Sequence, residues 1–286
     1  MNRKIVTTLA ILVLVILPFL CAIAISPYSP YAETNSFRAY LIISAAVSIA
    51  SILIVLRLLS YFHGSFEKIP VGGIILFLLL YPLVVIFGLA SGPDLSLKML
   101  EHPEREHLRY IMLFVALILF GGFVWWLYTY EALEIRKSTK WILAIILASA
   151  FAEYTWEFTH HYLYPEGLKE WVSQGKNAQD FSEHYDNIKT VRNLAVFGRY
   201  FQFMVVLWLS FHFYRLKQIK IWCLILNTLF SLLGITSATL VFINGFNFPK
   251  GFEFLMLFFI PGIAFFLLYW LGVALLTKFR KSERDS

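Results

Sequence analysis

The stretch that decides the fold is residues 141–161, "WILAIILASAFAEYTWEFTHH". It begins as an apolar run and continues, without a glycine or proline, into two glutamates and two histidines. A helix needs about 20 predominantly apolar residues to cross the hydrocarbon core of a bilayer. The stretch therefore predicts a membrane-spanning helix near 141–162 that carries ionisable side chains at its end.

The composition of the whole chain places it among polytopic membrane proteins. Of its 286 residues, 59% are hydrophobic and only 15% are charged, whereas soluble domains usually carry about a quarter charged residues. The net charge of +6 does not indicate a nucleic-acid partner. The basic residues stand in short groups between apolar runs, which is the pattern that membrane topology produces. The expected partner is the lipid bilayer itself.

Eight apolar segments are long enough to span, so we expect an all-α helical bundle that forms a single membrane domain over residues 1–286. The predicted spans lie near 4–26, 38–60, 70–91, 110–130, 141–162, 192–215, 219–244 and 252–278. Pro261 lies inside the last span and predicts a kink. The N-terminal segment also resembles a signal peptide with an A-x-A-like exit after Ala24. Cleavage there would leave seven spans.

The distribution of Lys and Arg predicts the orientation of these spans. Fourteen basic residues fall on the side that holds both ends of the chain, and nine fall in the longer opposite loops. Cytoplasmic loops carry the excess of Lys and Arg. Both termini are therefore expected in the cytoplasm, in an integral, multi-pass membrane protein.

Two outward loops are long enough to hold structure of their own. Residues 92–109 predict a short surface helix followed by a turn at Pro103. In residues 163–191, Leu168, Trp171 and Val172 have the spacing of a helix face that lies on a membrane surface. Structureless loops of this length are uncommon and often functional, so the second loop is a candidate part of a site.

The polar residues of the opening stretch fall on one side of the predicted helix. At about 100° per residue, Glu153, Glu157 and His160 share a face, and His161 lies at its margin. Charges are costly in hydrocarbon, so such a face is expected to point into the bundle.

The next span places a basic partner at the same depth. With a rise of about 1.5 Å per residue, Arg199 lies about 20 Å above the inner surface, close to the two glutamates. Arg192 and Gln202 share its helix face. The seventh span is the expected antiparallel neighbour, because only a very short turn joins it to the sixth. It adds three hydroxyl-bearing residues at a similar depth, Thr236, Ser237 and Thr239. Three helices are thus expected to surround one polar cavity that opens outward.

One functional hypothesis is a metal-assisted enzyme. Glu157 and His160 have the i, i+3 spacing of known carboxylate–histidine ligand pairs, and His161 and His184 are further candidate ligands of a divalent metal ion. A single Glu-x-x-His is a weak signal, and no His-Glu-x-x-His sequence is present. The expected reaction is hydrolysis or group transfer on a lipid or lipid-linked substrate at the outer leaflet. Its candidate catalytic residues are Glu153, Glu157 and Arg199, and its candidate substrate-binding residues are Arg192, Gln202 and Asp186.

Two alternatives stay open at the level of the sequence. Carboxylates beside an arginine and a histidine also serve proton- or solute-coupled transporters. The same residues equally suit an accessory subunit in which a buried ion-pair network only holds helices together. The sequence does not decide whether the chain is an enzyme.

Overall fold

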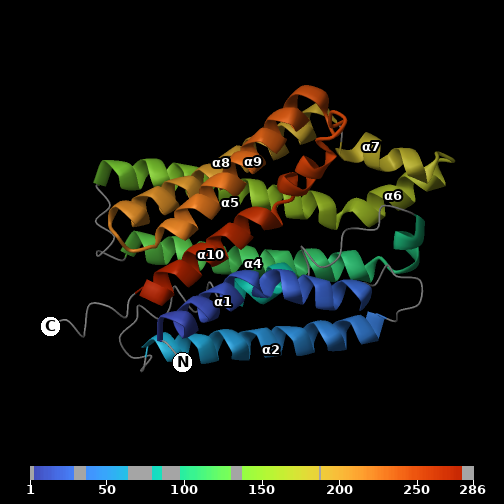
Figure 1. Ribbon diagram of the computed structural model, residues 1–286. Helices are drawn as coiled ribbons and strands as arrows, with labels where there is room; N and C mark the ends of the chain where they lie inside the picture. The colour runs from blue at the N-terminus through green and yellow to red at the C-terminus, as the bar shows by residue number, and fades with distance from the viewer. Residues whose placement is uncertain are drawn as a thin grey trace.

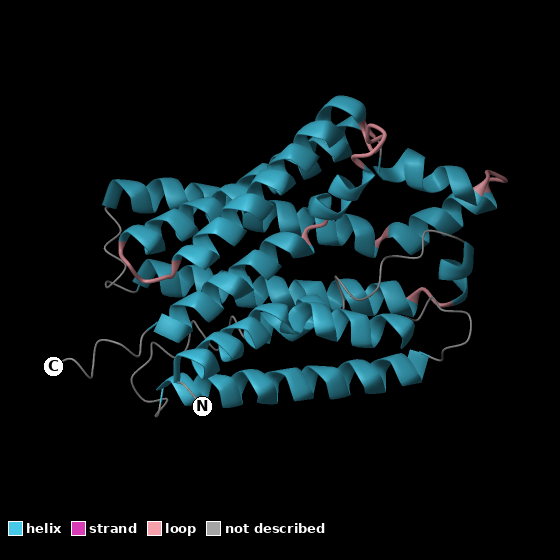
Figure 2. Cartoon of the chain, viewed as in Figure 1, coloured by secondary structure: helices cyan, strands magenta, loops and turns pink. Residues whose placement is uncertain are grey.

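The computed structural model describes residues 3–28, 37–63, 79–85, 97–129, 137–186 and 188–278 of the chain (Figure 1). The described residues form helices joined by turns and loops and contain no strand (Figure 2). Six of the described helices are long and apolar enough to cross a membrane, or seven if one bent pair counts as a single span. The prediction of an all-α membrane bundle is confirmed.

The helices follow the predicted spans closely, with one span largely outside the described residues. Residues 79–85 are the described part of the span predicted at 70–91. The elements are α1 (Arg3–Ile25), η1 (Ser26–Tyr28), α2 (Phe37–His63), η4 (Leu97–Glu101), α4 (Glu104–Thr129), α5 (Lys137–Tyr162), α6 (Tyr164–Ser173), η6 (Ala178–Asp180), α7 (Phe181–Asp186), α8 (Lys189–Arg215), α9 (Ile221–Asn244), η7 (Glu253–Phe259) and α10 (Gly262–Lys278), where η marks a 3₁₀ helix.

The long helices lie side by side, with α6 and α7 at one end of the bundle (Figure 1). The start of α1 and the end of α10 lie at the opposite end of the bundle (Figure 1). Helices α8 and α9 pack against each other across a short turn, as predicted. Which end of the bundle faces the cytoplasm stays a prediction.

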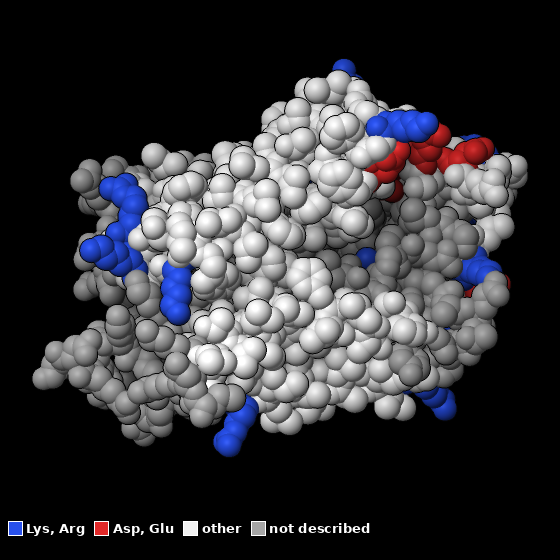
Figure 3. Space-filling model, in the orientation of Figure 1, with Lys and Arg blue, Asp and Glu red and all other residues white. Residues whose placement is uncertain are grey.

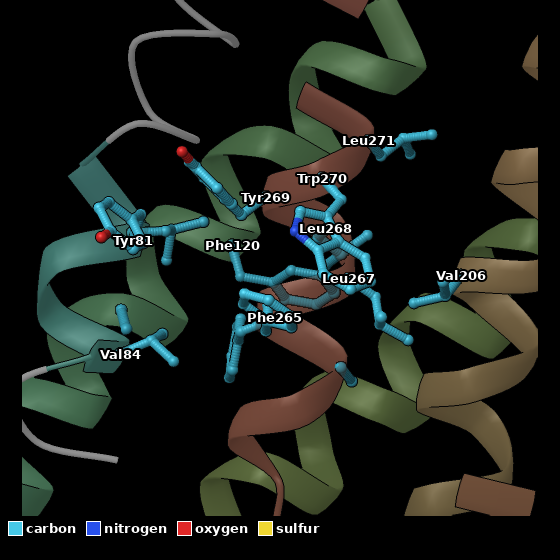
Figure 4. Close-up of a cluster of buried hydrophobic side chains, with 14 of the residues drawn as sticks. Tyr81, Val84, Phe120, Val206, Phe265, Leu267, Leu268, Tyr269, Trp270 and Leu271 are labelled. Atoms are coloured by element: carbon cyan, nitrogen blue, oxygen red, sulfur yellow. The ribbon is translucent and has the colours of Figure 1, made fainter. Parts of the chain in front are cut away.

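Helix α10 supplies much of the bundle's apolar core. Side chains from Ala264 to Leu275 are almost all buried, and Figure 4 shows several of them between residues of neighbouring helices. Pro18 lies inside α1 and has no N–H, so the carbonyl of Leu14 loses its usual helical donor. The hydroxyl of Tyr269 on α10 donates to that carbonyl at 2.8 Å. The proline of one helix thus creates a polar contact with another.

The last predicted span, 252–278, is wrong as a single helix. It consists of η7 and α10, whose axes differ in direction by 69° across a break at residues 260–261. Pro261 has no N–H for a helical bond, and a proline pushes the preceding residue toward extended backbone. Ile260 adopts this conformation, with φ −66° and ψ 128°. The kink expected from Pro261 is therefore a full break.

The described parts of the two loops that were predicted to face outward pack together into a small cap at the α6 end of the bundle. The helix expected in 92–109 is the 3₁₀ helix η4, with a turn at Pro103, and α4 begins at Glu104 rather than at residue 110. The face of α6 that contains Leu168 does not lie free on a membrane surface as predicted. It packs in an apolar cluster that includes Met99 of η4 and Phe181 of α7.

Candidate functional site

A buried network of charged and amide groups joins α5 to α8. Arg199 is fully buried, and its Nη2 donates to both carboxylate oxygens of Glu157. Its Nη1 donates to Gln202 Oε1 at 2.8 Å, and the Gln202 amide nitrogen donates in turn to Glu153. The structure thus brings together the two glutamates, the arginine and the glutamine that the helix faces predicted.

Close packing of the two helices makes this network possible. Gly198 precedes Arg199 on α8, and a Cβ atom at this position would overlap with the side chain of Glu153. A glycine therefore lets the Glu153 carboxyl pass over the backbone of α8. Glycine inside a helix is less favourable than alanine by about 1 kcal/mol. At position 198 the close approach of the two helices nevertheless requires it.

The network has a further partner that helix periodicity did not indicate. Arg199 Nε donates to the main-chain carbonyl of Phe259 at 2.5 Å. Phe259 is the last residue of η7, next to the break at Pro261. Carbonyls at a helix end lack partners within the helix, so the arginine satisfies one of the groups that the broken span leaves open.

A cavity of about 580 Å³ lies beside this network. Residues of α4, α5, α7, α8, α10, η7 and the segments around them line it, and most of the lining side chains are apolar, among them Leu113, Ala195, Phe246, Met256, Leu257 and Phe259. Figure 3 shows a hollow in this face of the molecule, close to the acidic side chains at the cap end. The cavity is of the size that binds small organic ligands.

Helix α9, which was expected to form the third side of the cavity, does not line it. The hydroxyl residues of α9 were predicted to face it, but none of them lines the cavity. Thr239 instead forms a hydrogen bond of 2.9 Å with Tyr200, and Ser237 is fully buried. The broken segment of η7 and α10 takes the place predicted for α9, because its bend at Pro261 brings it against α5 and α8.

The two histidines at the end of α5 have different surroundings. His160 Nε2 lies 3.3 Å from Asp186 Oδ1, and its ring stacks between Trp156 and Tyr185. The Tyr185 hydroxyl donates to the carbonyl of His160 at 2.9 Å. Burial raises the pKa of Tyr185 to about 12. Through these contacts His160 connects α5 to α7. Both His160 and Asp186 line the cavity.

His161 faces the cavity more openly. Its Nε2 lies 3.9 Å from Glu157 Oε1, and its ring stacks on Tyr110 of α4 with 5.6 Å between the centroids. Arg109 and Asp186 also lie within electrostatic range of it. An imidazole close to a fixed carboxylate can accept or donate a proton, so this pair is the part of the lining best suited to acid–base chemistry.

The predicted metal-ligand set does not come together. Glu157 is engaged by Arg199, His160 by Asp186, and the ring of His184 stacks on Trp171 in the cap, outside the cavity lining. Within the ranges that the structure describes, no group of three His, Cys, Asp or Glu side chains is arranged to hold a metal ion. The i, i+3 spacing of the motif instead serves two separate helix contacts.

The predicted substrate-binding residues divide into two groups. Arg192 and Asp186 line the cavity, whereas Gln202 is buried in the network behind it. Arg109, which is not among the predicted site residues, lines the cavity and is only 8% exposed. The apolar run of α4 starts at residue 110, so the sequence places Arg109 in the preceding loop. The i, i+3 spacing of Glu106 and Arg109 is the signal that extends the helix to include them.

Comparisons of the chain with family models, with curated proteins and with solved structures gave no match. The geometry of the cavity and its lining therefore carries the functional conclusion.

Proposed function

We propose that this membrane protein binds an amphipathic molecule, a lipid or lipid-linked substrate, in the cavity between α4, α5, α8 and the broken segment of η7 and α10. The observation that carries the proposal is the lining of the cavity. Apolar side chains form most of its walls, and the charged and aromatic groups of α4, α5 and α8 gather beside them. A ligand that fits such a lining has an apolar body and a polar head.

The exposure of η7 supports entry from the bilayer. Met256 and Leu257 line the cavity and are also exposed on the outside of the bundle, Leu257 to 61%. In a membrane-spanning bundle, exposed apolar side chains of this kind contact lipid chains. A lipid-like molecule can therefore reach the cavity past η7 without crossing water.

The proposal is tested with a phospholipid that carries a photoreactive diazirine in its acyl chain. After reconstitution and illumination, adducts are expected on buried cavity residues such as Leu113 and Phe259. An Ala195→Phe variant places a ring in the cavity and is expected to reduce these adducts strongly. The matched control is Leu194→Phe, because the neighbouring Leu194 is 40% exposed and does not line the cavity.

Labelling of outward-facing residues serves as an internal standard, since annular lipid reaches them in every variant. Ile145 is such a residue, with 65% of its side chain exposed. Equal labelling of Leu113 and Phe259 in Ala195→Phe and in the parent, with both proteins unfolding at the same temperature, would overturn the proposal.

Hydrolysis or group transfer on the bound molecule is a second candidate function, favoured by His161 and Glu157 at the cavity wall. In this role the His161 imidazole accepts and returns the proton. The test is mass spectrometry of a defined phospholipid mixture incubated with the reconstituted protein. Consumption of one lipid by the parent but not by His161→Gln supports catalysis, and an unchanged mixture in both refutes it for those lipids.

A further inference from the structure

The acidic side chains that line the cavity already have hydrogen-bond partners. Both oxygens of Glu157 accept from Arg199, and Asp186 is held by His160. Glu253 accepts from the main-chain N–H of Gly251 at 2.8 Å. Each of these lining acids thus has at least one partner, and Glu157 has both of its oxygens engaged.

The opposite holds for Arg109. Its side chain is about nine-tenths buried, yet its Nε and Nη1 atoms form no hydrogen bond with the residues that the structure describes. The nearest acid is Glu106, whose Oε2 lies 3.7 Å from Nη1, which is too long for a hydrogen bond. The remaining contact is with the ring of Tyr110. Buried charged donors are costly to leave without an acceptor.

From this imbalance we infer that the cavity recognises the anionic phosphate group of an amphipathic ligand, and that Arg109 is its principal donor. The inference rests on the proposed function and names the head of the molecule bound there. A guanidinium offers up to five N–H donors and pairs strongly with phosphate oxygens. The unbonded, buried donors of Arg109 thus favour an acceptor-rich anion over a cation or a neutral head.

A second arginine strengthens this assignment. Arg192 of α8 lines the same cavity as Arg109 of α4, so cationic groups approach it from two different helices. His161 lies within electrostatic range of Arg109 and is a further donor to an anion. A phosphate group presents more acceptor oxygens than a carboxylate and can meet donors from several directions. The apolar walls next to these groups then accommodate the acyl chains.

The experiment measures how well three molecules compete with the photoreactive phospholipid. Two of them share the same short acyl chains. Dihexanoyl phosphatidic acid carries the phosphate, dihexanoylglycerol lacks it, and inorganic phosphate lacks the tails. In the parent protein, the phosphatidic acid is expected to compete at about tenfold lower concentration than the diacylglycerol, because charge-assisted hydrogen bonds contribute on this order. Inorganic phosphate is expected to compete weakly.

Arg109→Gln is expected to abolish the preference, so that phosphatidic acid competes at about the same concentration as dihexanoylglycerol. Arg109→Lys retains the charge and is expected to keep part of the preference, which guards against a loss caused by misfolding. Arg215→Gln, at the other end of α8, is the matched control and should behave as the parent.

The outcomes separate this inference from the proposed function. Equal competition by the two dihexanoyl molecules in the parent overturns the phosphate assignment but leaves amphiphile binding intact. The same holds if Arg109→Gln retains the full preference. Failure of every tailed molecule to compete overturns the proposed function itself. Inorganic phosphate that competes as well as phosphatidic acid would show that the anion binds without a lipid, which also overturns the inference.

Discussion

Replacing Arg199 with leucine tests whether the buried network holds α5 and α8 together. The substitution leaves Glu153 and Glu157 in the bundle with no cation beside them. It also removes the donors to Gln202 and to the Phe259 carbonyl. Breaking a buried ion pair by removing one partner costs about 3–5 kcal/mol. We therefore expect Arg199→Leu to lower the free energy of unfolding by about this amount.

A triple variant separates the charges from the packing. Replacing a buried ion-pair network by apolar residues of similar volume is often neutral in stability. The variant Glu153→Leu/Glu157→Leu/Arg199→Leu is therefore expected to recover at least about 2 kcal/mol of the loss seen in the single variant. The part that it does not recover reports the lost donor to the Phe259 carbonyl and the buried Gln202 amide, which loses both of its partners.

The assay is equilibrium unfolding of the protein in mixed micelles of a mild detergent and sodium dodecyl sulphate, followed by tryptophan fluorescence. Arg215→Leu serves as control, because Arg215 lies at the exposed end of α8 and its replacement should change stability by no more than about 0.5 kcal/mol. A loss below about 1 kcal/mol in Arg199→Leu, or a triple variant no more stable than the single one, would refute the reasoning.

Three further predictions concern the packing of α8 and the docking of α7. Gly198→Ala should destabilise the protein by about 1–3 kcal/mol in the same unfolding assay, because its Cβ would overlap with the buried carboxyl group of Glu153. Gly121→Ala is the control: its Cβ would make an ordinary contact at 3.5 Å, so the free energy of unfolding should change little. Asp186→Asn weakens the contact to His160 and should speed limited proteolysis of the segment between α6 and α8; unchanged cleavage rates would contradict this docking role. The raised pKa of Tyr185, about 12, means that its docking contribution is fully present below pH 10 and is lost as the pH rises toward 12. In near-ultraviolet absorbance, the amplitude of the late tyrosine titration should be smaller in Tyr185→Phe than in the parent.

Much of this architecture is readable from local sequence. The spans follow from the length of the apolar runs, and the shared face of Glu153 and Glu157 follows from helix periodicity. The meeting of these glutamates with Arg199 follows from depth, since a charged group in hydrocarbon needs a partner at its own level. Each of these inferences uses one spanning helix or two spans that follow one another along the chain. They therefore depend on local sequence alone and agree with the structure.

The parts that were not predictable depend on contacts between distant segments. Hydropathy alone gives 252–278 as one span, since a proline inside an apolar run indicates a kink but not its angle. Arg109 was assigned to a loop because charged residues at the start of α4 look like a membrane boundary. Only the packing of α4 against α5 places its guanidinium in the cavity. The sequence likewise gives no sign that the Phe259 carbonyl would accept from Arg199, 60 residues away.

That single hydrogen bond connects the structural and the functional interpretations of the network. A broken span exposes main-chain carbonyls, and an unsatisfied carbonyl in hydrocarbon costs several kcal/mol. The hydrogen bond from Arg199 satisfies the carbonyl of Phe259. The two glutamates form ion pairs with the same arginine. The break in turn directs η7 away from α10 and turns its residues toward α5 and α8, where they form a wall of the cavity. The charged cluster thus stabilises the irregular backbone that forms one wall of the cavity, although Glu157 is its only member in the cavity lining.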